Sequence, residues 1–360
     1  MNLTRIKLNE FRNYDEIQLS FSAGINCITG LNGSGKTNLL NGIFYLCLGK
    51  GFTTGSDQQA IKKGADFFRI SGEFAYANGL DLIVCTYKQG SKKELLKNEV
   101  PYLKFSDHVG QYPAVVVCPD DQILIDGLSE ERRRYMDLTI SQTEPVYLKV
   151  LINYNRLLEQ RNAYLKRIAE EGKIDFDYLN TLNQQMSSEA DIVYQYRKQA
   201  MSVLNQSINE IYEMLAGRDE KIELTYESCL NENKLENLLQ KVQERDFILQ
   251  RTTEGIHRDD LSILLNGLSA KKFGSQGQKK TILLAMKLAQ HQFIKKQTQR
   301  NPLLLLDDIF DKLDEERMHR LIEIISKEPF GQVFITDTGR LRWHAFANPE
   351  LPVNFIAIGD

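Results

Sequence analysis

The sequence predicts an α/β fold that is interrupted by a helical insertion, and three observations predict it. Residues 3–29 alternate between apolar and polar side chains as strands do, and a glycine-rich loop and a helix follow at once. From about residue 130 to residue 249 the apolar spacing becomes helical. After residue 300 a strand, a helix and a further strand return. A helical second lobe is therefore inserted into an α/β domain.

Size and composition limit the classes of protein to consider. The chain has 360 residues, of which 42% are hydrophobic and 26% charged, as in a globular protein of about two domains or lobes. No apolar run approaches the roughly 20 residues of a membrane-spanning helix, and no export segment precedes the first strand, so we expect a cytoplasmic protein with no membrane partner. The five cysteines lack the spacing of disulfides or metal sites, and we expect buried thiols.

The N-terminal third shows strand signals around one helix. A helix is predicted by the apolar spacing of residues 38–48, directly after the glycine-rich loop. A break near Asn13 divides the first strand signal in two. The strand signals lie at residues 3–21, 25–29, 68–74, 80–87 and 114–118.

The middle of the chain predicts a helical hairpin, and the last part returns to mixed structure. Two helical runs end at Gly172 and Gly217 and favour an antiparallel helical hairpin, which is too short for a long coiled-coil arm. Residues 261–273 predict a β-hairpin that turns at Asn266-Gly267. The later signals predict a helix at 278–297, a strand at 303–306, a helix at 315–327 and a strand at 332–336.

The glycine-rich loop matches the phosphate-loop pattern GxxxxGK[ST] and lies between a strand and a helix, as such a loop must. Its glycines let successive backbone N–H groups donate to a phosphate, and the helix N-terminus adds a positive dipole. Lys36 is expected to reach the β- and γ-phosphates of ATP and to assist catalysis, and Thr37 to ligate Mg²⁺. The residues expected to bind ATP here are Gly30, Leu31, Asn32, Gly33, Ser34, Gly35, Lys36 and Thr37.

Two carboxylates directly follow the apolar strand at residues 303–306. Asp307 is the expected Mg²⁺ partner, through water, from the far side of the nucleotide. Asp308 is placed to orient the attacking water as a general base. An apolar strand that ends in Asp is common, but together with a phosphate loop it is a strong signal for a nucleotide site.

A third signal stands immediately before the predicted helix at 278–297. It consists of Ser275, Gln276, Gly277 and Gln278. Ser275 and Gly277 leave the helix N-terminus open to an anion such as a γ-phosphate, although a simple Gly-Ser helix cap is the alternative. The position of the motif between a helical insertion and a carboxylate strand resembles that of the signature motif of ABC-type ATPases. We therefore predict an ABC-type P-loop ATPase head, with lobe I formed by residues 1–119 and 300–360 and lobe II by residues 120–299.

Several stretches together make the chain resemble the RecF family of SMC-like ABC ATPases. The Gly-x-His-Arg-Asp-Asp and Ser-Gln-Gly-Gln sequences are far more specific to this family than the phosphate loop. Besides that loop, the matching stretches lie at residues 11–14, 119–121, 131–137, 158–162, 255–261, 275–278 and 306–314.

The resemblance implies ATP and Mg²⁺ as cofactors and a head-to-tail homodimer that sandwiches two ATP molecules. Ser275 to Gln278 would contact the ATP held by Lys36 of a second subunit, and Asp314 would lie in the D-loop that crosses the interface. The family binds single-stranded or gapped duplex DNA in this state, loads RecA with RecO and RecR during recombinational repair and replication-gap processing, and supports the SOS response. Asp308 stands where transporter-type ATPases have Glu, which implies slow hydrolysis and a switch.

Several positions of the sequence admit more than one interpretation. Residues 258–300 hold nine Lys or Arg against two Asp, and with Arg132 to Arg134 they either contact DNA phosphates or form a solvated face with salt bridges. The candidates for the sensor of the γ-phosphate are Thr336 and Thr338. The glutamine of the usual Q-loop is not evident, because Gln111 and Gln122 are both imperfectly placed. The alternatives are an ABC ATPase subunit of another machine such as a transporter, and a kinase of a small metabolite.

Overall fold

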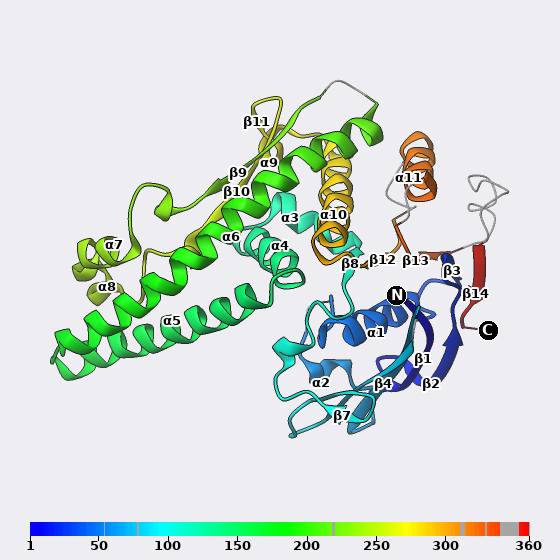
Figure 1. The fold of residues 1–360 in the computed structure, drawn as a ribbon, viewed down its shortest axis with the longest axis horizontal. Coiled ribbons are helices and arrows are strands. Elements are labelled where there is room, and N and C mark those ends of the chain that lie inside the picture. Colours follow the sequence, from blue (N-terminus) through cyan, green and yellow to red (C-terminus); the bar gives the residue numbers. More distant parts are fainter. Residues whose placement is uncertain are drawn as a thin grey trace. The chain divides into compact units, whose positions relative to one another are not determined.

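The protein is described by a computed structural model, drawn in Figure 1, in which two compact units can be distinguished. The described residues are 1–53, 55–77, 79–217, 220–309, 314–327, 330–338 and 353–359. Unit 1 comprises Met1–Gln122, Glu210–Asp219 and Gln276–Asp360, and unit 2 comprises Ile123–Asn209 and Glu220–Ser275. The predicted α/β class with a helical insertion is confirmed.

A five-stranded parallel sheet, in the order β14-β3-β13-β12-β8, lies in unit 1. Its strands are β3 (Ile25–Thr29), β8 (Ala114–Val117), β12 (Leu303–Leu306), β13 (Val333–Asp337) and β14 (Val353–Ala357). All residues of β3, β8, β12 and β13 are buried, which explains their nearly continuous apolar composition. The carboxyl ends of parallel strands share one edge, so the loops after β3 and β12 meet there. The edge strand β14 was missed by the sequence prediction.

A six-stranded antiparallel sheet, in the order β2-β1-β4-β5-β6-β7, forms the second layer of unit 1. Helix α1 (Lys36–Leu48) contacts strands of both sheets, so every residue from 39 to 48 is buried. Buried residues therefore lie on every face of this helix, which explains why its sequence is almost continuously apolar. The strands are β1 (Asn2–Phe11), β2 (Tyr14–Ser20), β4 (Phe67–Tyr76), β5 (Gly79–Lys88), β6 (Glu94–Lys97) and β7 (Val100–Pro101).

Helix α10 (Gln276–Thr298) packs on β8 and belongs to unit 1. The lobe boundaries stay a prediction, and this division differs from them because α10 was assigned to lobe II. Helix α11 (Glu315–Lys327) also lies in unit 1, as does the end of the long helix α6 (Phe176–Ala216). The shorter helical elements of this unit are α2 (Asp57–Ala60), η1 (Phe105–Asp107) and η2 (Pro119–Gln122).

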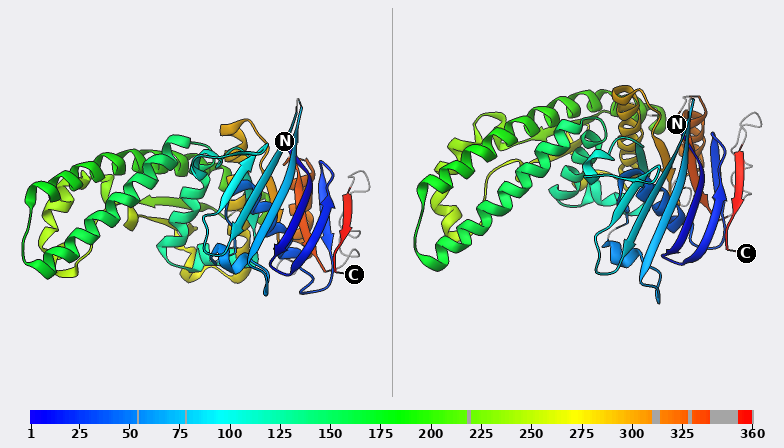
Figure 2. Two further views of the ribbon diagram at one scale, coloured as in Figure 1. Left: turned by 90° about the horizontal axis from the view of Figure 1, so that it is seen from below. Right: turned by 60° about the horizontal axis from the view of Figure 1, so that its bottom comes forward.

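Unit 2 is built around the helical hairpin of α5 (Pro145–Glu171) and α6 (Phe176–Ala216), which run side by side in Figure 2. Arg161 Nε of α5 donates to Asn183 Oδ1 of α6 at 2.8 Å, which joins the two helices inside the hairpin. The prediction of an antiparallel helical hairpin is confirmed. Its ends also agree, since Gly172 and Gly217 adopt φ angles of 67° and 61°. The other helical elements are α3 (Ile123–Asp126), α4 (Ser129–Ser141), η3 (Cys229–Asn231), α7 (Leu235–Lys241), α8 (Gln243–Leu249), η4 (Ile256–Arg258) and α9 (Ala270–Phe273).

The helical prediction for residues 130–249 was wrong at β9 (Ile222–Glu227). This strand pairs with β10 (Asp260–Leu265), and β11 (Leu268–Ser269) completes a three-stranded sheet. The alternation over six residues was too short to stand out beside the long helical runs. The expected hairpin at 261–273 forms in its first part, but residues 270–273 form α9 instead.

Two smaller predictions have mixed outcomes. Cys27, Cys47 and Cys85 are buried as expected, but Cys118 and Cys229 are partly exposed. No described helix combines the length and the apolar composition that crossing a bilayer requires.

Two buried histidines in unit 1 are expected to make the stability depend on pH. His108 and His291 are fully buried, and each Nε2–H donates to a carbonyl oxygen, Leu46 at 2.8 Å and Pro302 at 2.9 Å. Burial lowers the pKa of each histidine to about 4. The hydrogen bonds to the carbonyl oxygens oppose this shift but are the smaller effect. Between pH 6.5 and pH 4 the unfolded chain binds more protons than the folded protein. The free energy of unfolding therefore decreases as the pH is lowered, by about 1.4 kcal/mol per pH unit for each histidine.

Urea unfolding of the wild type and of His108→Gln between pH 6 and pH 4.5 measures this contribution. The amide keeps a donor toward Leu46 but does not titrate, so the slope of the variant is expected to be smaller by about 1.4 kcal/mol per pH unit. Equal slopes would show that His108 does not contribute.

Candidate nucleotide-binding site

The glycine-rich loop connects β3 to α1 and adopts a conformation that depends on its glycines. Gly33 and Gly35 have φ angles of 85° and 109°, which side chains other than glycine rarely adopt. At Gly30, a Cβ would lie only 2.4 Å from the carbonyl oxygen of Ile358. Lys36 is 8% exposed, and its Nζ donates to the carbonyl oxygens of Gly30 at 2.8 Å and Leu31 at 2.9 Å. Its cationic group is thus held over the loop.

The turn between β1 and β2 supports this loop from one side. The hydroxyl of Tyr14 donates to the carbonyl oxygen of Gly35 at 3.0 Å, and burial raises the pKa of Tyr14, so the phenol stays a donor. Asn13 Nδ2 donates to the carbonyl oxygen of Ser34 at 3.2 Å, while its Oδ1 accepts from Asn38 Nδ2 at 2.8 Å. The stretch at residues 11–14, which the sequence marked only by its resemblance, therefore stabilises the conformation of the glycine-rich loop.

The segment after β14 supports the loop from another side, and sequence reasoning missed it because no motif marks it. The N–H of Ile358 donates to the carbonyl oxygen of Thr29 at 2.9 Å. A Cβ on Gly359 would lie 2.6 Å from Cβ of Ser34, so the two segments pack closely. Residues more than 300 positions apart in the sequence thus shape one loop.

The two carboxylates after β12 lie beside the start of α1, as the shared edge of the sheet requires. Thr37 Oγ1 donates to Asp307 Oδ1 at 3.0 Å, and Thr336 Oγ1 donates to the same oxygen at 2.9 Å. The backbone N–H of Asp308 donates to Thr336 Oγ1 at 2.8 Å. Thr336, one of the two sensor candidates, therefore holds both carboxylate residues in place.

Asp307 is only 3% exposed, and burial raises the pKa of its carboxyl, with a smaller contribution from the charge of Asp308. The hydrogen bonds from Thr336 and Thr37 oppose this shift. A cation at this place would stabilise the ionised carboxylate. The hydroxyl and carboxylate oxygens are ligands that Mg²⁺ prefers, so the residues fit this metal. The described residues contain no group of three His, Cys, Asp or Glu able to hold a metal, so phosphate and water oxygens would complete its shell.

A pocket of about 250 Å³ opens beside these carboxylates within unit 1. Asp307 and Asp308 line it together with Gln276 and Lys280 from the beginning of α10. Gln122, one of the two glutamines considered for the Q-loop, also lines the pocket. The other candidate, Gln111, contributes its backbone carbonyl to a hydrogen bond from Arg300. The geometry therefore favours Gln122 as the glutamine of the site.

The predicted signature motif lies where the sequence placed it, at the N-terminus of a long helix. Helix α10 begins at Gln276, one residue after Ser275, and the boundary between the units also falls between these two residues. Asp314, the predicted D-loop residue, caps α11, since its Oδ1 accepts the N–H of Arg317 at 2.9 Å. The predicted action of both on a second subunit stays a prediction.

The structure separates the basic residues that the sequence grouped together. Several form intramolecular pairs: Arg132 binds both carboxylate oxygens of Asp260, at 2.6 and 2.9 Å, and Lys287 Nζ donates to Asp121 at 2.8 Å. Both basic side chains are buried. For these residues the salt-bridge alternative was the correct one. Exposed basic residues, which suit phosphate contacts, include Arg134, Arg258, Lys272 and Lys296.

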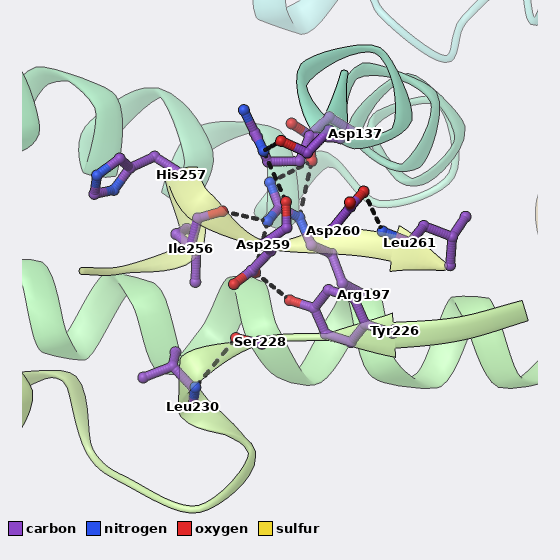
Figure 3. A network of polar contacts seen from close by, with 12 residues as sticks. Asp137, Arg197, Tyr226, Ser228, Leu230, Ile256, His257, Asp259, Asp260 and Leu261 are labelled. Atoms are coloured by element: carbon purple, nitrogen blue, oxygen red, sulfur yellow. Dashed lines mark hydrogen bonds and ion pairs between the residues drawn. The ribbon is translucent and has the colours of Figure 1, made fainter. Parts of the chain in front are cut away.

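The Gly-x-His-Arg-Asp-Asp stretch is held by a buried polar network in unit 2 (Figure 3). Arg197 of α6 donates to Asp259 Oδ2 at 2.9 Å, to the carbonyl oxygen of Ile256 at 2.8 Å and to Asp137 of α4 at 2.8 Å. The hydroxyl of Tyr226 donates to Asp259 at 2.5 Å. Burial raises the pKa of Asp259, and the charge of Arg197 opposes this shift. The network thus joins helices α4 and α6 and strand β9 to the residues directly before β10.

Comparisons with known proteins point to one family. Residues 2–75 match the family model of the RecF/RecN/SMC N terminal domain. The DNA replication and repair protein RecF of Flavobacterium johnsoniae is 42% identical over 338 residues, which cover 94% of each chain. RecF of Cytophaga hutchinsonii is 41% identical and covers 94% of this chain and 89% of its own.

Solved structures show the same fold. The recombination mediator protein RecF-ATP in the RecFOR pathway superposes with a TM-score of 0.87 at 30% identity, over 97% of this chain and 93% of that chain. The Smc head domain with an extended coiled coil from Pyrococcus furiosus has a TM-score of 0.55 at 18% identity, a likeness that concerns the fold alone.

Proposed function

Because the chain belongs to the RecF family of DNA replication and repair proteins, we propose that it is an ATP-dependent DNA-binding protein of recombinational repair and replication-gap processing. The observation that carries the proposal is the hydrogen bond between Thr37 and Asp307, which joins the phosphate loop to the carboxylate strand across 270 positions of sequence. This pairing assembles the elements that a nucleoside triphosphate with Mg²⁺ requires.

In the proposed mechanism the backbone of the phosphate loop and Lys36 bind the β- and γ-phosphates. Bound ATP supplies a γ-phosphoryl group that water can attack. Thr37 and Asp307 would hold Mg²⁺, which would neutralise charge on the phosphates. Asp308 orients the water and accepts its proton, and ADP is the leaving group. The hydroxyl of Thr336 fixes the position of the Asp307 carboxylate and of the backbone of Asp308, because it donates to the first and accepts from the second. Because Asp is shorter than Glu, hydrolysis is slow, and turnover limits how long the protein stays on DNA.

The same proposal includes a head-to-tail homodimer. Ser275 to Gln278 of one subunit contact the ATP that Lys36 of the other holds, and Asp314 lies at the interface. The ATP-bound dimer grips single-stranded or gapped duplex DNA through exposed basic residues such as Arg134 and Arg258. RecO and RecR, the partners that the name of the RecFOR pathway implies, and RecA act on the same DNA in the cytoplasm.

The transporter alternative is not favoured, because the curated relatives that match nearly the whole chain are DNA replication and repair proteins. The kinase alternative requires the phosphate loop alone and does not explain the motif Ser275 to Gln278. ATP-dependent dimerisation would contradict it.

Sedimentation velocity with a dye-labelled duplex that bears a single-stranded gap tests the proposal. In the presence of Mg·ATP we expect a dimer that sediments with the DNA, and without nucleotide a monomer that leaves the DNA free. A protein that stays monomeric under both conditions would contradict the switch.

Ser275→Arg is expected to leave ATP binding by the monomer nearly unchanged and to prevent closure of the dimer. The larger side chain stands at both symmetric sites, so the dimer should weaken about 100-fold. Ser275→Ala, which removes the hydroxyl but adds no bulk, is the matched control and should weaken the dimer far less than Ser275→Arg. If the Arg variant lost ATP binding as an isolated monomer, Ser275 would be a structural residue of the chain's own site.

A further inference from the structure

One arginine connects the first turn of α11 to the first turn of α10, both in unit 1. Arg317 Nη1 lies 2.9 Å from where a Cβ on Gly277 would stand, and its Cζ lies 3.5 Å from that point. A side chain at this position would push the guanidinium away. Glycine therefore allows the guanidinium to rest against the helix that the signature motif begins.

The same guanidinium is held by the predicted D-loop residue. Arg317 Nη1 donates to Asp314 Oδ2 at 2.5 Å, and Asp314 Oδ1 accepts the backbone N–H of Arg317 at 2.9 Å. Arg317 Nε is buried and has no hydrogen-bond partner among the described residues. The position of the guanidinium thus depends on Asp314 on one side and on the space at Gly277 on the other.

We propose that Arg317 is a positioning residue for the composite nucleotide site. It keeps the turn at Gly277 and the D-loop residue Asp314 at a fixed separation, so that one subunit presents both together to the nucleotide of a second copy. This inference rests on the proposed function, because it requires the head-to-tail dimer. A preformed arrangement reduces the ordering that association would otherwise require.

Arg317→Gln removes the charge and keeps a side chain of similar length. We expect the ATP-dependent dimer to dissociate about 10-fold more readily, since each dimer contains the pair twice, while ATP affinity of the monomer and the melting temperature stay unchanged. Arg317→Lys should recover part of the loss, because it keeps the charge but not the planar fork. A normal dimer in the Gln variant would overturn the proposal.

The chain offers a matched control one turn further along α11. Arg320 pairs with Glu316 at 2.6 Å and donates to the carbonyl oxygen of Leu215 at 3.2 Å. Arg320→Gln therefore removes a similar ion pair of the same helix without touching Gly277, and dimerisation should be unchanged. If it weakened the dimer as much as Arg317→Gln, loss of helix stability would be the cause and the proposal would be wrong.

A double-mutant cycle tests whether the arginine acts through its partner. Asp314→Asn should weaken the dimer about as much as Arg317→Gln, and the double variant should be no weaker than either, because both remove one pair. Additive losses would mean that the two residues act separately, which contradicts the proposal.

Mixing of variants shows on which subunit Arg317 acts. A mixture of the Lys36→Ala and Arg317→Gln variants contains heterodimers. In each heterodimer one composite site combines the wild-type phosphate loop of the Arg317→Gln subunit with the wild-type Arg317 of the Lys36→Ala subunit. Hydrolysis should return in the mixture at concentrations where each variant alone is inactive. If Arg317 served the phosphate loop of its own subunit, no activity would return.

The reference mixture is Lys36→Ala with Ser275→Arg, for which the proposed function predicts the same recovery. Recovery there but not with Arg317→Gln would refute the role of Arg317 and leave the sandwich dimer standing. No recovery in either mixture would refute the head-to-tail dimer itself, and the inference with it.

Discussion

Lys36→Ala is expected to abolish ATP-dependent dimerisation and, with it, the retention of DNA. The lysine Nζ lies 2.8 and 2.9 Å from two carbonyl oxygens of the phosphate loop, and the side chain is 8% exposed, so its charge is directed into the loop rather than into solvent. A cation that donates charge-assisted hydrogen bonds to two phosphates from such a place contributes about 3 kcal/mol, or roughly 100-fold in affinity.

Binding of Mg·ATP by the monomer and sedimentation velocity measure the two parts of this effect. The variant should show no dimer at an ATP concentration that saturates the wild type. Because Lys36 also bonds the carbonyl oxygens of Gly30 and Leu31, the melting temperature without nucleotide serves as the control for folding. Dimer levels like those of the wild type, in a folded variant, would refute the assignment of this loop.

Asp308→Asn is expected to slow hydrolysis by about 100-fold or more while ATP still closes the dimer. The amide has nearly the same size as the carboxylate but cannot accept the proton of the attacking water. The contact that fixes this residue, from its backbone N–H to Thr336, does not involve the side chain and is retained. The complex with gapped DNA should therefore persist after the wild-type complex has dissociated.

Single-turnover hydrolysis and the lifetime of the DNA complex test this expectation. Asp307→Asn is the informative contrast, because it removes the carboxylate that Thr37 and Thr336 hold toward the metal. That variant should lose nucleotide-dependent closure as well as hydrolysis. A wild-type rate in Asp308→Asn would show that another group activates the water.

Much of the candidate site could be predicted from short stretches of sequence. The phosphate loop, the carboxylates at 307 and 308 and the helix that begins near Ser275 all lie where the sequence placed them. Each of these signals combines a backbone requirement with a reactive group within a few residues. The turn, the strand end or the helix start is therefore specified locally.

Other features could not be predicted because they depend on contacts between distant segments. Arg132 and Lys287 were both candidates for DNA contacts in the sequence, but both are buried in ion pairs with carboxylates far along the chain. Whether a basic side chain faces solvent or an acidic partner depends on the packing of several elements. The contribution of the segment after β14 to the phosphate loop was missed for the same reason.

By itself, the sequence determined which groups the proposed site contains: a glycine-rich loop that would wrap phosphate, a cation at residue 36, and two carboxylates that would serve a metal and a water. Only the tertiary structure decided how these groups meet. Parallel pairing of β3, β13 and β12 brings Thr37 and Thr336 to the same oxygen of Asp307, and the fold of unit 1 places Arg317 of α11 at Gly277 of α10. Local motifs follow from the conformational preferences of a few residues, whereas these contacts follow from the burial of apolar strands and helices that are far apart in sequence.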